Sequence, residues 1–175
     1  MNFENFITGS TGLIHFIASL MALLTGTFVL LMPKGTTKHK RIGQIYVMSM
    51  LVVLSTAFMT YKHFGNWGIF HWTAGISSIT LILGFIPIYL RRPLNSYISL
   101  HFCFMYWSVM GVYAAFVSET LVRMPKVVVD SNIPNKVFYQ MTGIGTALIM
   151  ALGLSFFLKY KPKWNKQFAG STLKK

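Results

Sequence analysis

The chain has 175 residues, of which 54% are hydrophobic and 15% aromatic, and its formal net charge is +13. Charged residues make up 11% of the chain, against about 25% in a soluble domain. The basic residues separate long apolar runs, a pattern that indicates an integral membrane protein. The positive charge is therefore not gathered on a soluble face, which excludes nucleic-acid binding. The one cysteine, Cys103, excludes an internal disulfide and a cysteine-based zinc site.

Five apolar runs are long enough, at about 20 residues each, to cross a bilayer as helices. In chain order they are residues 13–32, 42–61, 69–90, 97–117 and 137–158. The sequence therefore predicts an all-α fold, a polytopic membrane bundle of five transmembrane helices. Residues 1–160 form its one domain, and residues 161–175 form a basic tail. The N-terminus has no basic segment before its apolar run, so we expect no cleaved signal peptide.

The turn after the first run, MPKGTTKHKR, contains helix stop and start signals. Pro33 and Gly35 end the first helix, and Thr36 or Thr37 is expected to cap the second. His39 follows this cap, and Gly43 comes one helical turn later.

The basic residues concentrate on one side of the membrane. The loops at 33–41 and 91–96 and the tail after 158 hold 12 of the 16 cations, whereas the other segments hold all three acidic residues. The positive-inside rule then predicts an outside N-terminus and a cytoplasmic C-terminus. We expect the protein in the bacterial cytoplasmic (inner) membrane, with its basic loops and tail on anionic lipid headgroups.

Four histidines lie within or beside the expected spans, where an ionisable group is costly and indicates a function. His15 and His71 come from the first and third runs at nearly equal depth, about 4 Å from the outer edge. Glu119, at the outer end of the fourth run, can join them. His39 and His101 approach the inner face from the second and fourth runs. The sequence thus predicts an outer pair and an inner pair.

Paired imidazoles from facing helices are the axial ligands of a bis-histidine haem b. A porphyrin also needs a helix without bulky side chains beside its ligand. Three of the histidines have a small residue one turn later: Ser19 after His15, Gly43 after His39 and Gly75 after His71. We therefore expect haem b at both faces and electron transfer across the membrane. With the boundaries above, His39 and His101 differ in height by about 10 Å, so the inner haem requires both boundaries to move.

Two alternatives remain. A carboxylate beside two histidines suits zinc or iron better than haem, so His15, His71 and Glu119 form a candidate metal site, with hydrolytic chemistry as one use. Arg123, one turn after Glu119, also gives that carboxylate a structural ion-pair partner. In the other alternative the histidines are structural, and the chain is a homo-oligomer or a non-enzymatic subunit of a membrane complex. The sequence contains no phosphate-binding loop or nucleophile elbow, and it assigns no enzymatic activity.

Several segments resemble a known family. They are PKGTTKHKRIGQIYV (33–47), the arginine pair at 91–92, HFCFMYWSVMGVYAAFVSET (101–120) and VRMP (122–125). Together they resemble the bacterial predicted membrane proteins of domain of unknown function 2306, over residues 13–125. The matching positions are His39, Arg41, Gly43, Tyr46, His101, Glu119 and Arg123. The resemblance implies a multi-span architecture and no activity. In arrangement alone, the paired histidines are also similar to those of two-haem transmembrane b-type cytochromes.

Overall fold

The computed structural model describes residues 9–59, 68–92, 96–129 and 135–172, and every regular element in these ranges is a helix. In chain order the helices are α1 (Gly9–Leu31), α2 (Thr37–Met59), α3 (Ile69–Leu90), α4 (Tyr97–Val129) and α5 (Asn135–Thr172). All five contain an apolar stretch long enough to cross a bilayer. The prediction of an all-helical, five-span membrane bundle is confirmed.

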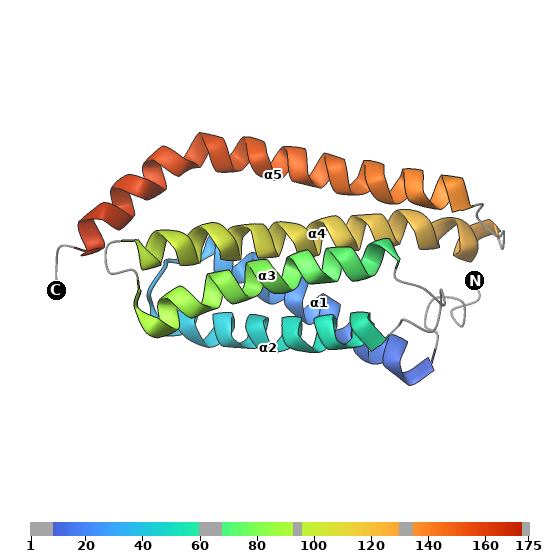
Figure 1. Cartoon of the computed structure of the whole chain (residues 1–175), viewed down its shortest axis with the longest axis horizontal. Coiled ribbons are helices and arrows are strands. Elements are labelled where there is room, and N and C mark those ends of the chain that lie inside the picture. Colours follow the sequence, from blue (N-terminus) through green and yellow to red (C-terminus); the bar gives the residue numbers. More distant parts are fainter. Residues whose placement is uncertain (1–8, 60–67, 93–95, 130–134, 173–175) are drawn as a thin grey trace.

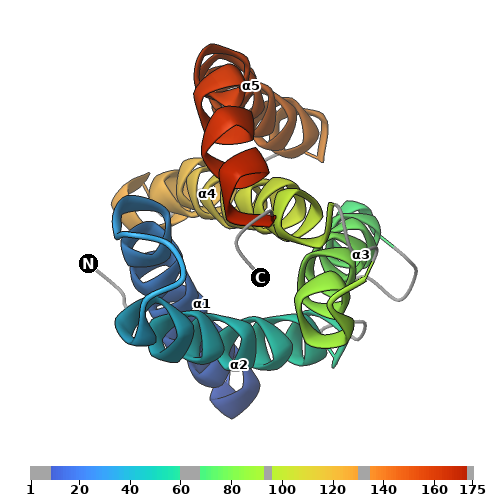
Figure 2. The same ribbon diagram turned by 90° about the vertical axis from the view of Figure 1, so that its left-hand side faces the viewer.

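Helices α1 to α4 form a ring of antiparallel neighbours, which closes where α1 packs on α4 (Figures 1 and 2). Seen along the bundle, α1 lies diagonally opposite α3, and α2 lies diagonally opposite α4 (Figure 2). Helix α5 packs against α4 on the outside of the ring. Residues that point into the ring from α2 and α4 approach one another, as the hydrogen bond between Tyr46 and Ser108 shows.

One end of the bundle carries the turn between α1 and α2, the start of α4 and the C-terminal part of α5 (Figure 1). We call residues 32–41, 91–92 and 159–172 the basic end, because most of the cations of the chain lie there. The starts of α1 and α3 lie at the opposite end (Figure 1). The gathering of cations at one end agrees with the positive-inside pattern, while the direction in which the bundle crosses the membrane stays a prediction.

Helix α2 begins at Thr37, five residues before the apolar run that predicted it. Its first turn is capped by Thr36, whose Oγ1 accepts a hydrogen bond from the backbone N–H of His39 at 3.1 Å. A capping hydroxyl stabilises a helix start even where the following residues are charged. The predicted threonine cap is confirmed, and the helix begins before the expected membrane span.

Two helices continue well past their apolar runs. The fourth run was expected to end at 117 and the fifth at 158, whereas α4 reaches Val129 and α5 reaches Thr172. A helix can leave the bilayer without ending, because its backbone hydrogen bonds are made within the segment. The basic tail expected after residue 160 is therefore helical as far as the structure describes it.

Tyr46 of α2 occupies the middle of the ring and is fully buried. Its hydroxyl is hydrogen-bonded to Ser108 Oγ of α4 at 2.8 Å. A Cβ placed on Gly26 of α1 would lie 3.0 Å from the Tyr46 ring, so this glycine lets α1 approach the tyrosine closely. The surrounding core cluster consists of Ala22, Met50, Leu54, Ala74, Leu81, Met105 and Val109. Tyr46 thus ties α1, α2 and α4 together halfway along the bundle.

Two groups can be distinguished among the glycines of the spans. A Cβ would lie 2.7 Å from Met105 Sδ at Gly84, 3.1 Å from a Leu121 methyl at Gly145, and 3.1 Å from Met110 at Gly153. These three positions, together with Gly26, have the close helix contacts expected of small residues in membrane bundles. Gly43, Gly75 and Gly143 differ, since no described neighbouring atom lies within 4 Å of such a Cβ. Packing between helices does not explain the second group.

Candidate functional site

The inner pair lies near the basic end of the ring. His39 is the third residue of α2, and His101 is the fifth residue of α4. Counted from the helix starts, their heights differ by about 3 Å, and the two side chains are close enough to interact electrostatically. The mismatch of about 10 Å was counted from the apolar edges, outside which His39 lies, whereas the cap at Thr36 places His39 inside α2.

His101 has a fixed proton position. Its Nδ1 lies 2.6 Å from the backbone carbonyl oxygen of Gly84 on α3. A carbonyl oxygen only accepts, so Nδ1 carries the proton and Nε2 of the neutral ring has a lone pair. Metal-binding histidines commonly have this second-shell hydrogen bond, which orients the ring and sets its tautomer. The donor chemistry of His101 therefore suits axial ligation through Nε2.

His39 contributes a buried nitrogen with no hydrogen-bond partner. Its Nδ1 is the atom concerned, judged against the side chains and backbone that the structure describes. A buried, unsatisfied polar atom costs about 1–3 kcal/mol, so each one calls for an explanation. A role as ligand would supply one. The inner pair fits a bis-histidine haem on this ground.

A cation adjoins the inner pair. Lys34, in the turn before α2, interacts electrostatically with His39. Its Nζ donates hydrogen bonds to the carbonyl oxygens of Val29 at 2.7 Å and Leu30 at 2.5 Å, at the C-terminal end of α1. Burial lowers the pKa of Lys34 below its ordinary value. A positive charge here would complement an acidic group of any bound cofactor.

His15 of the outer pair is held by a threonine. Its Nδ1 lies 2.8 Å from Thr56 Oγ1 on α2. Thr56 donates its hydroxyl proton to backbone carbonyl oxygens, at 2.7 Å for Val52 and 3.0 Å for Val53. Its oxygen therefore accepts from the Nδ1–H of His15, which leaves the lone pair of the neutral ring on Nε2. His15 and His101 thus have the same tautomer, each fixed by a partner on a neighbouring helix.

Nε2 of His15 faces Glu119 Oε1 of α4 at 3.8 Å. The structure thereby joins two members of the predicted metal trio. No group of three histidine, cysteine or acidic residues within the described ranges lies close enough to hold a metal ion. The side chain of Arg123, the predicted partner of Glu119, lies outside what the structure describes.

His71 has a capping role that the sequence did not indicate. It is buried in the first turn of α3, and its Nδ1 accepts a hydrogen bond from the backbone N–H of Gly68 at 3.1 Å. A neutral His71 then carries its proton on Nε2. Ligation through Nε2 would require the ring to exchange this hydrogen bond for a proton on Nδ1. The outer pair fits a haem less well than the inner pair for this reason.

The glycines predicted to flank a porphyrin are Gly43 and Gly75. They follow His39 and His71 by one turn, and the described part of the chain puts no atom within 4 Å of a Cβ added at either position. This is the bare helix surface that the haem hypothesis requires beside a ligand. Because neither glycine makes a close contact with another of the described helices, the alternative explanation, that they are small in order to let helices pack closely, is weakened.

Sequence reasoning missed three partners of the histidines. Thr56 lies 41 residues from His15, and Gly84 lies 17 residues from His101 and acts through its backbone. The only signal for Thr56 is a polar residue inside an apolar run. A backbone carbonyl gives no signal at all, and neither does the amide of Gly68.

Comparison with known proteins identifies a family but assigns no activity. The family model "Predicted membrane protein (DUF2306)" matches residues 12–158, a range that contains the four candidate histidines and Glu119. No curated protein and no solved structure matches the chain.

Proposed function

The chain belongs to the DUF2306 family of predicted membrane proteins, and we propose that it is a bis-histidine haem b protein that transfers electrons across the membrane. His39 and His101 would hold the inner haem. His15 and His71 would hold the outer one. A bound haem supplies one-electron redox chemistry, with a potential tuned by the residues around it.

One observation carries the proposal: the buried Nδ1 of His39 has no hydrogen-bond partner in the described chain, and His101 is its neighbour on the diagonal helix. The Gly84 carbonyl supports it by orienting His101 with Nε2 available. The open space beside Gly43, one turn after His39, also supports it, because a porphyrin needs room beside its ligand. Lys34, which interacts electrostatically with His39, would attract a carboxylate of the haem b.

The remaining parts of the function concern the membrane. Five spanning helices imply association with a lipid bilayer. We further propose the bacterial cytoplasmic membrane with the basic end inside, next to anionic headgroups. Assembly as a homo-oligomer or within a larger membrane complex stays a prediction.

The variants His39→Ala and His101→Ala test the inner site. Each variant, purified in detergent from haem-replete cells, should lose about half of the haem that the wild-type protein carries, because the outer site remains. Lys38→Ala, an exposed neighbour of His39, is the matched control and should keep the full content. Unchanged haem content in both histidine variants would contradict the assignment of the inner ligands.

A metal site at the outer face is the second candidate, favoured by the 3.8 Å approach of His15 Nε2 to Glu119 Oε1. To hold zinc or iron the pair would need His71 to approach it, since the described residues do not bring the three side chains together; hydrolytic chemistry is then one use. Elemental analysis should find about one such ion per chain without haem, and His15→Ala should remove it. Equal metal content in the wild-type protein and His15→Ala would exclude this candidate.

A further inference from the structure

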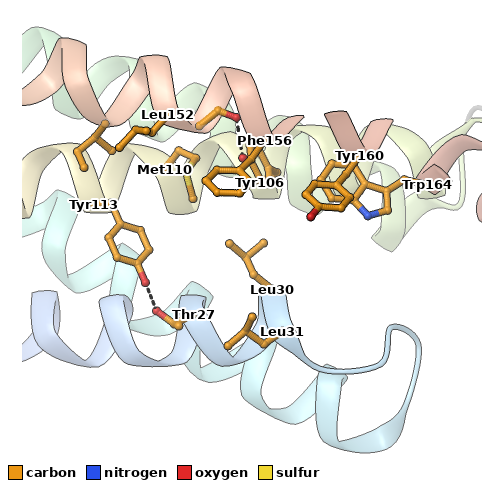
Figure 3. Close-up of a pocket in the computed structure, with 12 residues that line it drawn as sticks. Thr27, Leu30, Leu31, Tyr106, Met110, Tyr113, Leu152, Phe156, Tyr160 and Trp164 are labelled. Atoms are coloured by element: carbon orange, nitrogen blue, oxygen red, sulfur yellow. Dashed lines mark hydrogen bonds between the residues drawn. The ribbon is translucent and has the colours of Figure 1, made fainter. Parts of the chain in front are cut away.

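A groove runs along the outside of the ring between α1 and α5, with α4 as its floor (Figure 3). Its volume is about 360 Å³, within the range of about 300–1,000 Å³ that is typical of ligand sites. Leu30 of α1 and Leu152 and Phe156 of α5 line its walls, and Tyr106 and Met110 lie on its floor. The groove arises because α5 packs on α4 outside the ring.

Three side chains of the lining, Thr27, Tyr106 and Tyr113, have hydrogen-bond partners for their hydroxyl groups, and the other two polar side chains, Tyr160 and Trp164, lie near the basic end. Tyr106 donates its hydroxyl proton to the carbonyl oxygen of Gly153 at 2.7 Å. Thr27 donates to the carbonyl oxygen of Leu23 at 2.6 Å, and its Oγ1 is hydrogen-bonded to the Tyr113 hydroxyl at 2.5 Å (Figure 3). The rest of the lining is aliphatic or aromatic. A hydrocarbon chain suits such a surface, and a strongly polar ligand does not.

The groove has an aromatic wall at the basic end. Helix α5 bends there (Figure 1) and contains Pro162, a residue that kinks helices. Trp164, beyond the proline, packs against Phe102 with ring centroids 4.5 Å apart and against Tyr106 at 5.8 Å. Tyr160 stacks on Trp164 at 5.8 Å. These contacts hold the last turns of the spanning part of α5 close to α4.

Cations flank this same end of the groove. Lys34 binds the carbonyl oxygen of Leu30, a lining residue, on the α1 side. On the α5 side Lys159, Lys161 and Lys163 belong to the same turns of the helix as the lining residues Tyr160 and Trp164, and Lys159 Nζ lies 5.6 Å from the centroid of the Tyr160 ring. The sequence has no acidic residue between positions 5 and 118 or after 130. No carboxylate of the chain in those segments can neutralise these lysines, so an anion from the membrane is their natural counterion.

We propose that the groove binds one acyl chain of an anionic phospholipid, with the lipid phosphate between Lys34 and the lysines of α5. An apolar groove with cations on the helices at one of its ends matches the two halves of such a molecule. The lining of the groove includes neither His39 nor His101, whereas Lys34 adjoins both the groove and His39.

Thermal unfolding in a neutral detergent tests the proposal. Phosphatidylglycerol at about a hundred times its dissociation constant should raise the midpoint by about 5 °C or more. Phosphatidylcholine with the same acyl chains should raise it much less. Free phosphate should have no effect, because it cannot fill the groove. Equal shifts with the two lipids, or an equal shift with free phosphate, would overturn the proposal.

Matched variants locate the site. Leu152→Trp fills the groove. Leu154→Trp is its control, because Leu154 does not line the groove and is similarly exposed, with an exposed fraction of 46% against 57% for Leu152. Lys34→Gln removes the charge on the α1 side, and Lys38→Gln removes an exposed charge of the same turn. The readout is the phosphatidylglycerol shift minus the phosphatidylcholine shift within each variant, so a general loss of stability cancels.

The difference between the two lipids should disappear in Leu152→Trp and in Lys34→Gln and persist in both controls. An unchanged difference in Leu152→Trp would show that the lipid binds elsewhere. An isoprenoid quinone that stabilises the protein as strongly as phosphatidylglycerol, in a manner abolished by Leu152→Trp, would assign the groove to a quinone instead. Conversion of a dimer to a monomer by Leu152→Trp would assign it to a second copy of the chain.

Discussion

His101 of α4 donates its Nδ1 proton to the carbonyl oxygen of Gly84 on α3 across 2.6 Å. The same glycine is in close contact with Met105, one turn after His101, where a Cβ would lie 2.7 Å from Sδ. Gly84 therefore both brings α3 close to α4 and orients the histidine. The orientation of the His101 imidazole is thus set by a backbone atom of the neighbouring helix, α3.

The two groups of glycines should respond oppositely to substitution. Gly84→Ala forces Met105 to move and should destabilise the protein by about 1–3 kcal/mol. Gly43→Ala meets open space and gains helix propensity, so it should be neutral or stabilising by up to about 1 kcal/mol. Unfolding in mixed micelles measures both values. A comparable loss of stability in the two variants would contradict the distinction between packing glycines and open ones.

Enlarging the open glycines should separate folding from haem binding. Gly43→Leu and Gly75→Leu should fold like the wild-type protein, because the described neighbours leave room at both positions. Both variants should carry less haem, since the new side chain occupies the surface beside the ligand. Gly143→Leu, at an open glycine on α5, is the control and should keep its haem. Full haem content in all three variants would show that the space beside His39 and His71 has no role in haem binding.

The hydrogen bond between Tyr46 and Ser108 should contribute modestly to stability. A double-mutant cycle of Tyr46→Phe and Ser108→Ala isolates it, because each change removes one partner with little change in shape. We expect a coupling energy of about 0.6 kcal/mol, the average for such bonds between membrane helices, with about 1.7 kcal/mol as the upper limit. A coupling indistinguishable from zero would mean that the ring is held at this level by packing alone.

Thr56→Val should act on the outer site alone. The substitution keeps the shape of the side chain and removes the oxygen that accepts the Nδ1 proton of His15. Haem bound at the outer face should fall, and haem at the inner face should stay, as read from a redox titration that resolves two components. Thr80→Val is the control, because Thr80 donates to the carbonyl oxygen of Ser77, within its own helix. Equal loss of both components in Thr56→Val would contradict the role given to Thr56.

Labelling of single cysteines should establish the direction of the bundle. In a Cys103→Ala background, Lys38→Cys lies at the basic end and Ser10→Cys lies at the opposite end, and both positions are exposed. A membrane-impermeant maleimide added to intact spheroplasts should label Ser10→Cys and leave Lys38→Cys unlabelled. The reverse pattern would overturn the predicted topology.

Apolar length and charge asymmetry were sufficient to predict the five spans and their order. They did not predict the helix ends. Thr36 starts α2 before the apolar run begins, and α5 continues through Lys159 and beyond because helical hydrogen bonds do not require apolar side chains. The early start of α2 matters most for the inner pair, because it places His39 within the helix.

The candidate site was predictable as a set of residue types but not as a set of hydrogen bonds. The distribution of His15, His39, His71 and His101 along the spans suggested two faces, and the ring places their helices on two diagonals. The partner of each ring nitrogen depends on the rotation of neighbouring helices, which periodicity does not reveal. His71 illustrates this, because its Nδ1 caps its own helix at Gly68.

The central claim is that the protein binds haem through paired histidines, and the visible absorption spectrum of the wild-type protein tests it most directly. The protein should be purified in detergent from haem-replete cells and measured before and after reduction with dithionite. The account predicts a Soret band that sharpens and shifts on reduction, with the resolved visible bands of a low-spin, six-coordinate haem b. A spectrum without a Soret band, from folded protein, would contradict it.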